Sequence, residues 1–249
     1  MKYVLALLLG LAASPLKADE NEWRPPFITT PPEVVERMLE LAGTRAEDFV
    51  IDLGSGDGRI VIAAAQKFGA RGLGIELDAG LVDKSIQAAR AAEVTEKAQF
   101  VQGDVLVADI SKATVVTVYL LPALMAKLQA RFIDELAPGT RIVAHAFGMA
   151  GWAPDRSATV KLKERHRGQG DESTLHLWVV PAEVRGVWRG PGVQVRIEQN
   201  YQQIEVDGAA GTLAGRSIAW DGFKGRVEGN RIVGELAGRP VELRRVGLR

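Results

Sequence analysis

Apolar and polar positions follow two different periods along the first two thirds of the chain. Short apolar runs that predict buried strands lie near residues 49–54, 72–77, 98–103, 114–120 and 140–147. Apolar positions at helical spacing predict helices near residues 33–41, 59–68, 79–93 and 123–136. Strands and helices that alternate in this way predict a parallel sheet with right-handed crossovers.

The rhythm changes after the fifth strand. Residues 158–166 and 173–180 alternate apolar and polar positions and are joined by the turn "RGQGDE", which predicts an antiparallel hairpin. From Glu183 onward, glycine turns such as Gly229-Asn230 separate alternating segments that predict strands, namely "VQVRIEQ", "QIEVDG", "SIAWDG", "RVEGNRIVGEL" and "PVELRRV". We therefore expect an α/β fold with a Rossmann-like, doubly wound, mostly parallel sheet that ends in an antiparallel hairpin. A small C-terminal antiparallel β meander follows, and the two domains span residues 25–181 and 183–249.

The turn between the first strand and the next helix carries a glycine motif. The stretch "VIDLGSGDGRI", residues 50–60, places Gly54, Gly56 and Gly58 at alternate positions. Glycine permits positive φ and a close approach of the backbone to a ligand. The first amides of the following helix add unpaired donors, so this turn predicts a ligand site.

The neighbouring residues decide which ligand the turn suits. A P-loop needs Lys followed by Ser or Thr, whereas Arg59-Ile60 follows here. The dinucleotide motif G-x-G-x-x-G is one residue longer than this one. Asp52 and Asp57 would repel a pyrophosphate but attract an ammonium and a sulfonium. These features favour S-adenosylmethionine as the cofactor.

Two further strand ends carry acids. Glu76 ends the strand in "GLGIELDAGLV", and an acid about 20 residues beyond a glycine turn is placed to accept both ribose hydroxyls. The strand in "FVQGDVL" ends in Gly103-Asp104, where a carboxylate can accept the adenine amino group. Glu76 alone could be a solvated strand end and Asp104 alone a helix cap. Their order along alternating strands predicts one nucleoside lying across the carboxyl edge of the sheet.

With these motifs the chain resembles the seven-strand S-adenosylmethionine-dependent methyltransferases over residues 25–181. "VIDLGSGDGR" matches their first motif, "GIELD" the acidic second strand and "GDV" the adenine-side motif. A closer likeness is to the small lysine methyltransferases related to the ATP synthase c-subunit lysine methyltransferase and their bacterial relatives. The segments that carry it are "PPFITTPPEVVERML", "DLGSGDGRIVIAAA" and "VYLLP".

The resemblance implies roles for individual residues. It implies that Asp52, Gly54 and Gly56 line the methionine part, that Glu76 binds the ribose and that Asp104 binds the adenine. Tyr119, at the end of the fourth strand, is the implied catalytic residue beside the transferring methyl group. The complete implied cofactor set is Asp52, Gly54, Ser55, Gly56, Asp57, Gly58, Glu76, Leu77, Asp104, Val105 and Tyr119.

The fourth strand departs from one branch of the family. Relatives that methylate DNA bases or glutamine amides often carry Asn/Asp-Pro-Pro-Tyr there, but residues 118–122 read "VYLLP". This argues against those acceptors and leaves a lysine ε-amine, a small amine or a hydroxyl open. We expect methyl transfer to an amine, foremost a protein lysine.

Composition excludes several other partners. Lys+Arg and Asp+Glu are both 31, so no net charge attracts nucleic acid, and the absence of cysteine rules out zinc–cysteine and redox sites. His145, His166 and His176 lack the spacing of metal ligands, and no metal is expected. We interpret them as structural, with one alternative, that His145 faces the substrate cleft. Trp188, Tyr201 and Trp220 are expected in a core or, alternatively, on a binding face.

The first residues predict export. Lys2, an apolar run from Tyr3 to Ala13 and a small residue at Ala18 have the pattern of a signal peptide over residues 1–18. The run is too short for an ordinary membrane span, so membrane contact is expected only through an uncleaved leader. The mature chain would be periplasmic or otherwise exported, or cytoplasmic if the leader is not functional. S-adenosylmethionine is made in the cytoplasm. The alternative function is therefore an exported, non-catalytic binding protein that retains the fold. The sequence specifies no oligomeric state.

Overall fold

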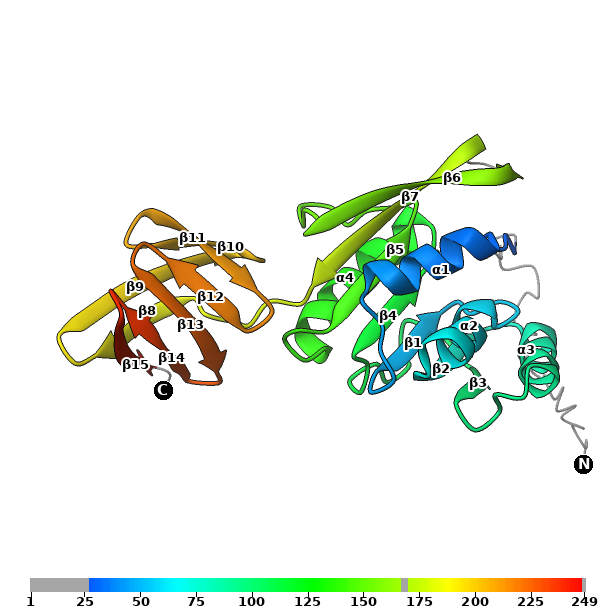
Figure 1. Ribbon diagram of the computed structural model, residues 1–249, viewed down its shortest axis with the longest axis horizontal. Coiled ribbons are helices and arrows are strands. Elements are labelled where there is room, and N and C mark those ends of the chain that lie inside the picture. Colours follow the sequence, from blue (N-terminus) through cyan, green and yellow to red (C-terminus); the bar gives the residue numbers. More distant parts are fainter. Residues whose placement is uncertain (1–26, 167–169, 248–249) are drawn as a thin grey trace, which may run out of the picture.

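The computed structural model describes residues 27–166 and 170–247. The predicted signal peptide, residues 1–18, lies outside the described residues, as does part of the turn in the predicted hairpin. An α/β domain and a β-barrel follow each other along the chain, and the barrel lies on the α4 side of the α/β domain (Figure 1).

The α/β domain is built on a seven-stranded sheet with the order β3-β2-β1-β4-β5-β7-β6. Strands β1 to β5 are parallel, and β7 is antiparallel to both β5 and β6. The predicted parallel sheet and its terminal hairpin are confirmed. The strand order reverses between β1 and β4, where open α/β sheets bind ligands. The strands are β1 (Phe49–Leu53), β2 (Arg71–Glu76), β3 (Ala98–Gln102), β4 (Val115–Val118), β5 (Arg141–His145), β6 (Arg156–His166) and β7 (Gly170–Val179).

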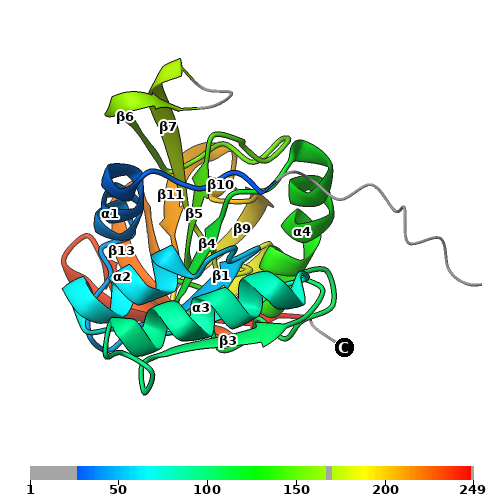
Figure 2. The ribbon, with the colours of Figure 1, turned by 90° about the vertical axis from the view of Figure 1, so that its right-hand side faces the viewer.

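Helices cover both faces of this sheet (Figure 2). Apolar residues of α1 and α2 pack with Val50, Val115 and Val143, while α3 packs on β3 beside α2. Residues of α4 pack with the alternate strand positions Ile51 and Val116 on the opposite face. No helix in the described ranges is both long and apolar enough to cross a membrane. The helices are α1 (Pro32–Leu41), α2 (Arg59–Phe68), α3 (Ala79–Ala91) and α4 (Pro122–Glu135).

The C-terminal strands close into a barrel in which each strand is antiparallel to the next and β15 pairs with β8. The predicted meander is confirmed, but its closure was not foreseen. Strands β8 and β11 were also missed, because "GVWRG" and "AAGTLA" are rich in glycine and alanine. The strands are β8 (Gly186–Gly190), β9 (Val193–Asn200), β10 (Gln203–Val206), β11 (Ala209–Ala214), β12 (Ser217–Trp220), β13 (Phe223–Glu228), β14 (Arg231–Leu236) and β15 (Arg239–Val246).

The aromatic residues of the barrel serve two purposes. Trp188 is fully buried in the barrel core, and Trp220 stacks on Phe223 with ring centroids 3.8 Å apart. Trp188 therefore lies in the barrel core and Trp220 packs against it, as one of the two interpretations of the sequence predicts. Tyr201 instead leaves the barrel and packs against the core of the α/β domain.

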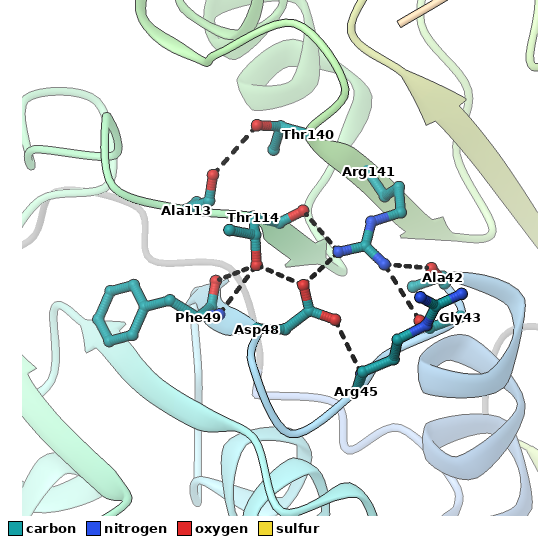
Figure 3. A network of polar contacts seen from close by, with 9 residues as sticks. All are labelled: Ala42, Gly43, Arg45, Asp48, Phe49, Ala113, Thr114, Thr140 and Arg141. Carbon is teal, nitrogen blue, oxygen red and sulfur yellow. Dashed lines mark hydrogen bonds and ion pairs between the residues drawn. The ribbon is translucent and has the colours of Figure 1, made fainter.

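A polar network joins the amino ends of β1, β4 and β5 (Figure 3). The Asp48 carboxylate accepts hydrogen bonds from the Thr114 hydroxyl at 2.7 Å and the Arg45 amide at 2.8 Å. It also forms an ion pair with Arg141, which in turn donates to two carbonyls at the end of α1. The network stabilises the edge of the sheet opposite to the predicted cofactor residues.

Candidate active site

The predicted cofactor residues lie at or directly after the carboxyl ends of β1 to β4, which are at one edge of the sheet. Gly54, Gly56 and Gly58 have φ of 79°, 55° and 80°, values that favour glycine. A Cβ at Gly54 would lie 2.9 Å from Leu120 Cδ2, and one at Gly56 would collide with the Phe27 ring. The predicted glycine turn is therefore confirmed in its backbone.

Glu76 lies against this turn. Its Oε2 accepts a hydrogen bond from the Gly56 amide at 2.9 Å, and its Oε1 accepts one from the Asp78 amide at 3.0 Å. Each carboxylate oxygen can accept a further hydrogen bond. The structure thus places the acid beside the glycine turn, as the motif spacing predicts.

Asp52 is buried beneath the turn. It is 2% exposed, and its Oδ1 accepts a hydrogen bond from the Thr117 hydroxyl at 2.7 Å. The pKa of Asp52 is raised to about 7, chiefly by burial and also by the nearby negative charges of Glu76 and Asp57, against the opposing effect of the Thr117 hydrogen bond. A cationic ligand group close to Asp52 would favour its ionised form.

Asp57 has an internal partner that the sequence prediction did not include. The Arg59 guanidinium donates to both carboxylate oxygens, at 2.8 and 2.5 Å. Burial raises the pKa of Asp57, but the hydrogen bonds and charge of Arg59 outweigh it and hold the pKa below its usual value. Arg59 also donates to the Thr30 carbonyl at 2.8 Å, so the ion pair connects the segment before α1 to the turn.

The Ser55 hydroxyl is a further polar group of the turn, and it lies close to Gly74 of β2. Ser55 is 5% exposed, and its Oγ has no hydrogen-bond partner among the described residues. A buried polar atom without a partner costs about 1–3 kcal/mol, which a polar ligand atom would offset. The buried acid, the amides of the glycine turn and this hydroxyl together fit the amino-acid part of S-adenosylmethionine.

The adenine side of the site is more open. Leu77 is 53% exposed, and Val105 is half-buried. Asp104 is exposed, and its Oδ1 accepts a hydrogen bond from the Leu106 amide at 2.8 Å. This hydrogen bond matches the alternative role of Asp104 as a cap of the following segment. The contact of Asp104 with adenine stays a prediction.

An aromatic group occupies the ends of β4 and β5. Tyr119 directly follows β4, and its ring centroid lies 4.1 Å from that of His145 and 6.5 Å from that of Phe147. His145 is 1% exposed, and the Thr30 hydroxyl lies 3.4 Å from its Nδ1. The structure therefore brings His145 to Tyr119, whereas His176 pairs with Ser157 in the hairpin.

Sequence reasoning missed Phe147. Its position depends on Ala146, which has a φ of 70°, while the Phe147 amide donates to the His145 carbonyl at 2.9 Å. These features define a γ-turn with positive φ, a rare and strained conformation for alanine. No local residue pattern signals it, so only the structure shows Phe147 beside Tyr119.

Comparison with known proteins gives consistent results. Residues 52–156 match the family model described as the ANTKMT methyltransferase domain. A protein-lysine N-methyltransferase of Saccharolobus islandicus is 37% identical over 62% of this chain and 93% of its own length. The human lysine N-methyltransferase named for the ATP synthase c-subunit is 34% identical over 52% of this chain, which spans 55% of the human protein.

A solved structure extends the likeness to three dimensions. The RNA methyltransferase of Salinibacter ruber, in complex with S-adenosylhomocysteine, is 49% identical and has a TM-score of 0.57. The match covers 63% of this chain and 96% of that one. The family match ends at residue 156, before the barrel begins at Gly186.

Proposed function

The chain belongs to the ANTKMT methyltransferase family, and from this premise we propose that it methylates a lysine side chain of a protein. It is an S-adenosylmethionine-dependent methyltransferase, and the acceptor is what the proposal adds. The observation that carries it is the aromatic group of Tyr119, His145 and Phe147 at the strand ends next to the cofactor residues. Two relatives named as lysine methyltransferases support the same acceptor.

The cofactor positions belong to the proposal. Asp52, Ser55 and the amides of the glycine turn would bind the methionine part, because a buried carboxylate with a pKa near 7 gains a cationic partner there. Glu76 would accept the ribose hydroxyls with the lone pairs that its two backbone bonds leave. Asp104, Leu77 and Val105 would bind the adenine.

The acceptor side must supply an uncharged amine. S-adenosylmethionine, when bound, supplies a methyl group on a sulfonium that leaves readily. A lysine ammonium has no lone pair, so it has to lose its proton to solvent before it can react. Aromatic rings exclude water and disfavour the charged amine, while the Tyr119 hydroxyl can accept or donate a hydrogen bond to orient it. Alignment of the nitrogen lone pair supplies most of the catalysis.

Two other functions have weaker support. The Salinibacter ruber structure is named as an RNA methyltransferase, but this chain has 31 basic and 31 acidic residues and thus no net positive charge. The non-catalytic binding protein is not favoured, because the glycine turn, Asp52 and Glu76 are all retained.

The acceptor is tested by labelling. Purified full chain is incubated with tritiated S-adenosylmethionine and either cell-lysate protein or total cellular RNA from the same source. We expect label in protein that protease releases and ribonuclease does not, with methyl-lysine in the acid hydrolysate. Label confined to RNA, or protein label on residues other than lysine, would overturn the proposal.

A matched variant tests the role of Tyr119. Tyr119→Phe keeps the ring beside His145 but removes the hydroxyl. We expect kcat to fall by about tenfold or more, with an unchanged Kd for S-adenosylhomocysteine. An equal loss of cofactor affinity would instead assign Tyr119 to the cofactor pocket.

A further inference from the structure

We infer that the C-terminal barrel positions the acceptor site, and that Tyr201 in the turn between β9 and β10 is the positioning residue. The segment it acts on is residues 146–155, between β5 and β6, which we call the acceptor loop. The inference rests on the proposed function, because it takes Tyr119 and Phe147 as the acceptor site. It assigns a role to the C-terminal barrel, which lies outside the residues that match the family model.

The acceptor loop begins in a conformation that needs support. Ala146 has a φ of 70°, and strained backbone of this kind persists only where its surroundings hold it. Two hydrogen bonds act at the turn itself, from the Ala146 amide to the Thr174 carbonyl at 2.8 Å and from the Phe147 amide to the His145 carbonyl at 2.9 Å. A change farther along the loop would therefore alter the position of the Phe147 ring relative to Tyr119.

The far end of the acceptor loop is held by the barrel. Trp152 is 1% exposed, and its ring stacks on Tyr201 with centroids 5.0 Å apart and an interplanar angle of 4°. The Gln202 side-chain amide donates to the Ala153 carbonyl at 2.6 Å. The Trp152 carbonyl accepts from Trp178 Nε1 at 2.9 Å, which ties the same residue to the sheet.

One side chain connects the barrel, the loop and α4. Gln129 of α4 donates from Nε2 to the Tyr201 hydroxyl at 2.8 Å and to the Ala150 carbonyl at 2.9 Å. The phenol is therefore both a stacking partner and a hydrogen-bond partner. Helix α4 begins four residues after Val118 ends β4, so its position is linked to that of Tyr119.

Tyr201 lies in a tight turn whose backbone conformation recurs in the barrel, since Asp207 and Ala237 also have a positive φ, of 50°. Tyr201 has a φ of 54°, a conformation that a chain reversal would normally give to Asn or Gly. Gln199 stabilises it by donating from Nε2 to the Tyr201 carbonyl at 2.8 Å. The barrel has a separate attachment to the α/β domain, where Arg216 donates from Nε to the Pro138 carbonyl at 3.4 Å. Tyr201 is therefore not needed merely to keep the barrel attached.

The test separates loop order from cofactor binding. In full-length Tyr201→Ala, hydrogen exchange of amides 147–153 should rise about tenfold or more, while amides 54–58 and the Kd for S-adenosylhomocysteine stay unchanged. Tyr201→Phe keeps the stacked ring and should show an intermediate increase. Gln203→Ala alters an exposed residue of β10 beside the turn and should leave loop exchange as in the parent chain.

Activity gives a second readout. With tritiated S-adenosylmethionine and lysate protein as acceptor, Tyr201→Ala should raise the acceptor KM or lower kcat at saturating cofactor. Tyr201→Phe should retain most of the parent activity. Unchanged loop exchange in Tyr201→Ala, or an equal rise at residues 54–58, would overturn the inference. Should Tyr201→Ala fail to fold, exchange in Tyr201→Phe equal to that of the parent would overturn it. Exchange does not depend on the acceptor, so failure of the proposed function would be seen separately.

Discussion

At the scale of single residues, the charge of Asp52 is the property most sensitive to its surroundings. Its folded pKa of about 7 lies above the usual value because the carboxylate is buried and has acidic neighbours. A cationic ligand favours the ionised form, so affinity should rise as the pH increases through 7. We expect the Kd for S-adenosylmethionine to fall by about tenfold between pH 6 and pH 8.

Calorimetric titration of parent and Asp52→Asn measures this effect. The variant keeps an oxygen that can accept the Thr117 hydrogen bond but has no charge to titrate. Any titration of the ligand itself is common to both proteins and cancels in the comparison. A pH dependence that is identical in both would contradict a cationic group beside Asp52.

Glu76 gives a second prediction at this scale. Glu76→Ala removes a charged acceptor for two ribose hydroxyls, which should cost about 1.5–3 kcal/mol, or roughly 10- to 150-fold in cofactor affinity. Glu76→Gln, which keeps one acceptor oxygen, should lose less. Isothermal titration with S-adenosylhomocysteine measures both, and a melting curve checks the turn that Glu76 also holds. An unchanged Kd would rule out the ribose contact.

At the scale of elements, the amino ends of three strands depend on the Asp48 network. Burial raises the pKa of Asp48, but the hydrogen bonds from Thr114 and Arg141 outweigh it and hold the pKa below its usual value. This contribution to stability is present above the unfolded pKa and is lost as the pH falls through the folded pKa. Asp48→Ala removes the acid that pairs with Arg141 and leaves the guanidinium with backbone carbonyls alone, which should cost about 1.5–3 kcal/mol.

Urea unfolding at pH 7 and at pH 3 tests the network. The decrease in the free energy of unfolding caused by Asp48→Ala should be large at pH 7. It should be smaller at pH 3, where the parent protein begins to lose the same interaction. Asp83→Ala, at an exposed helix position, is the matched control and should change stability little. A similar loss from both variants would show that the network contributes nothing specific.

At the scale of the whole molecule, two cores are joined by a few contacts. The barrel core around Trp188 and Phe223 is separate from the clusters that surround the sheet. Calorimetry should therefore show two unfolding transitions. S-adenosylhomocysteine at about 100 times its Kd should raise the midpoint temperature of only one transition, by about 5–10 °C. The reason is that the ligand adds about 2.7 kcal/mol to the free energy of unfolding of the α/β domain alone. An equal shift of both would show one cooperative unit.

Localisation is also a property of the whole chain. We propose that residues 1–18 are removed on export and that the mature protein begins at Asp19. Cell fractionation followed by N-terminal sequencing should recover this form from the periplasm. A chain beginning at Met1 in the cytoplasm would contradict export and would place the enzyme where its cofactor is made.

What the sequence determined by itself lies in consecutive residues. Apolar periodicity predicts the strands and helices of the α/β domain, because each element buries one face and repeats its side chains at a fixed spacing. The glycine turn and the acid at Glu76 were predicted for a similar reason, since backbone conformation and strand ends are local properties. The order of these motifs was sufficient to indicate the cofactor and the family.

Only the tertiary structure decided the contacts between distant residues. Barrel closure depends on the pairing of β15 with β8. The Gly-rich β8 has no alternating apolar and polar pattern from which this strand could be predicted. The positive φ of Ala146, the place of Phe147 and the stacking of Tyr201 on Trp152 all arise from packing between separate elements. Packing selects these conformations against local preference, and so residues near them in the chain do not encode them.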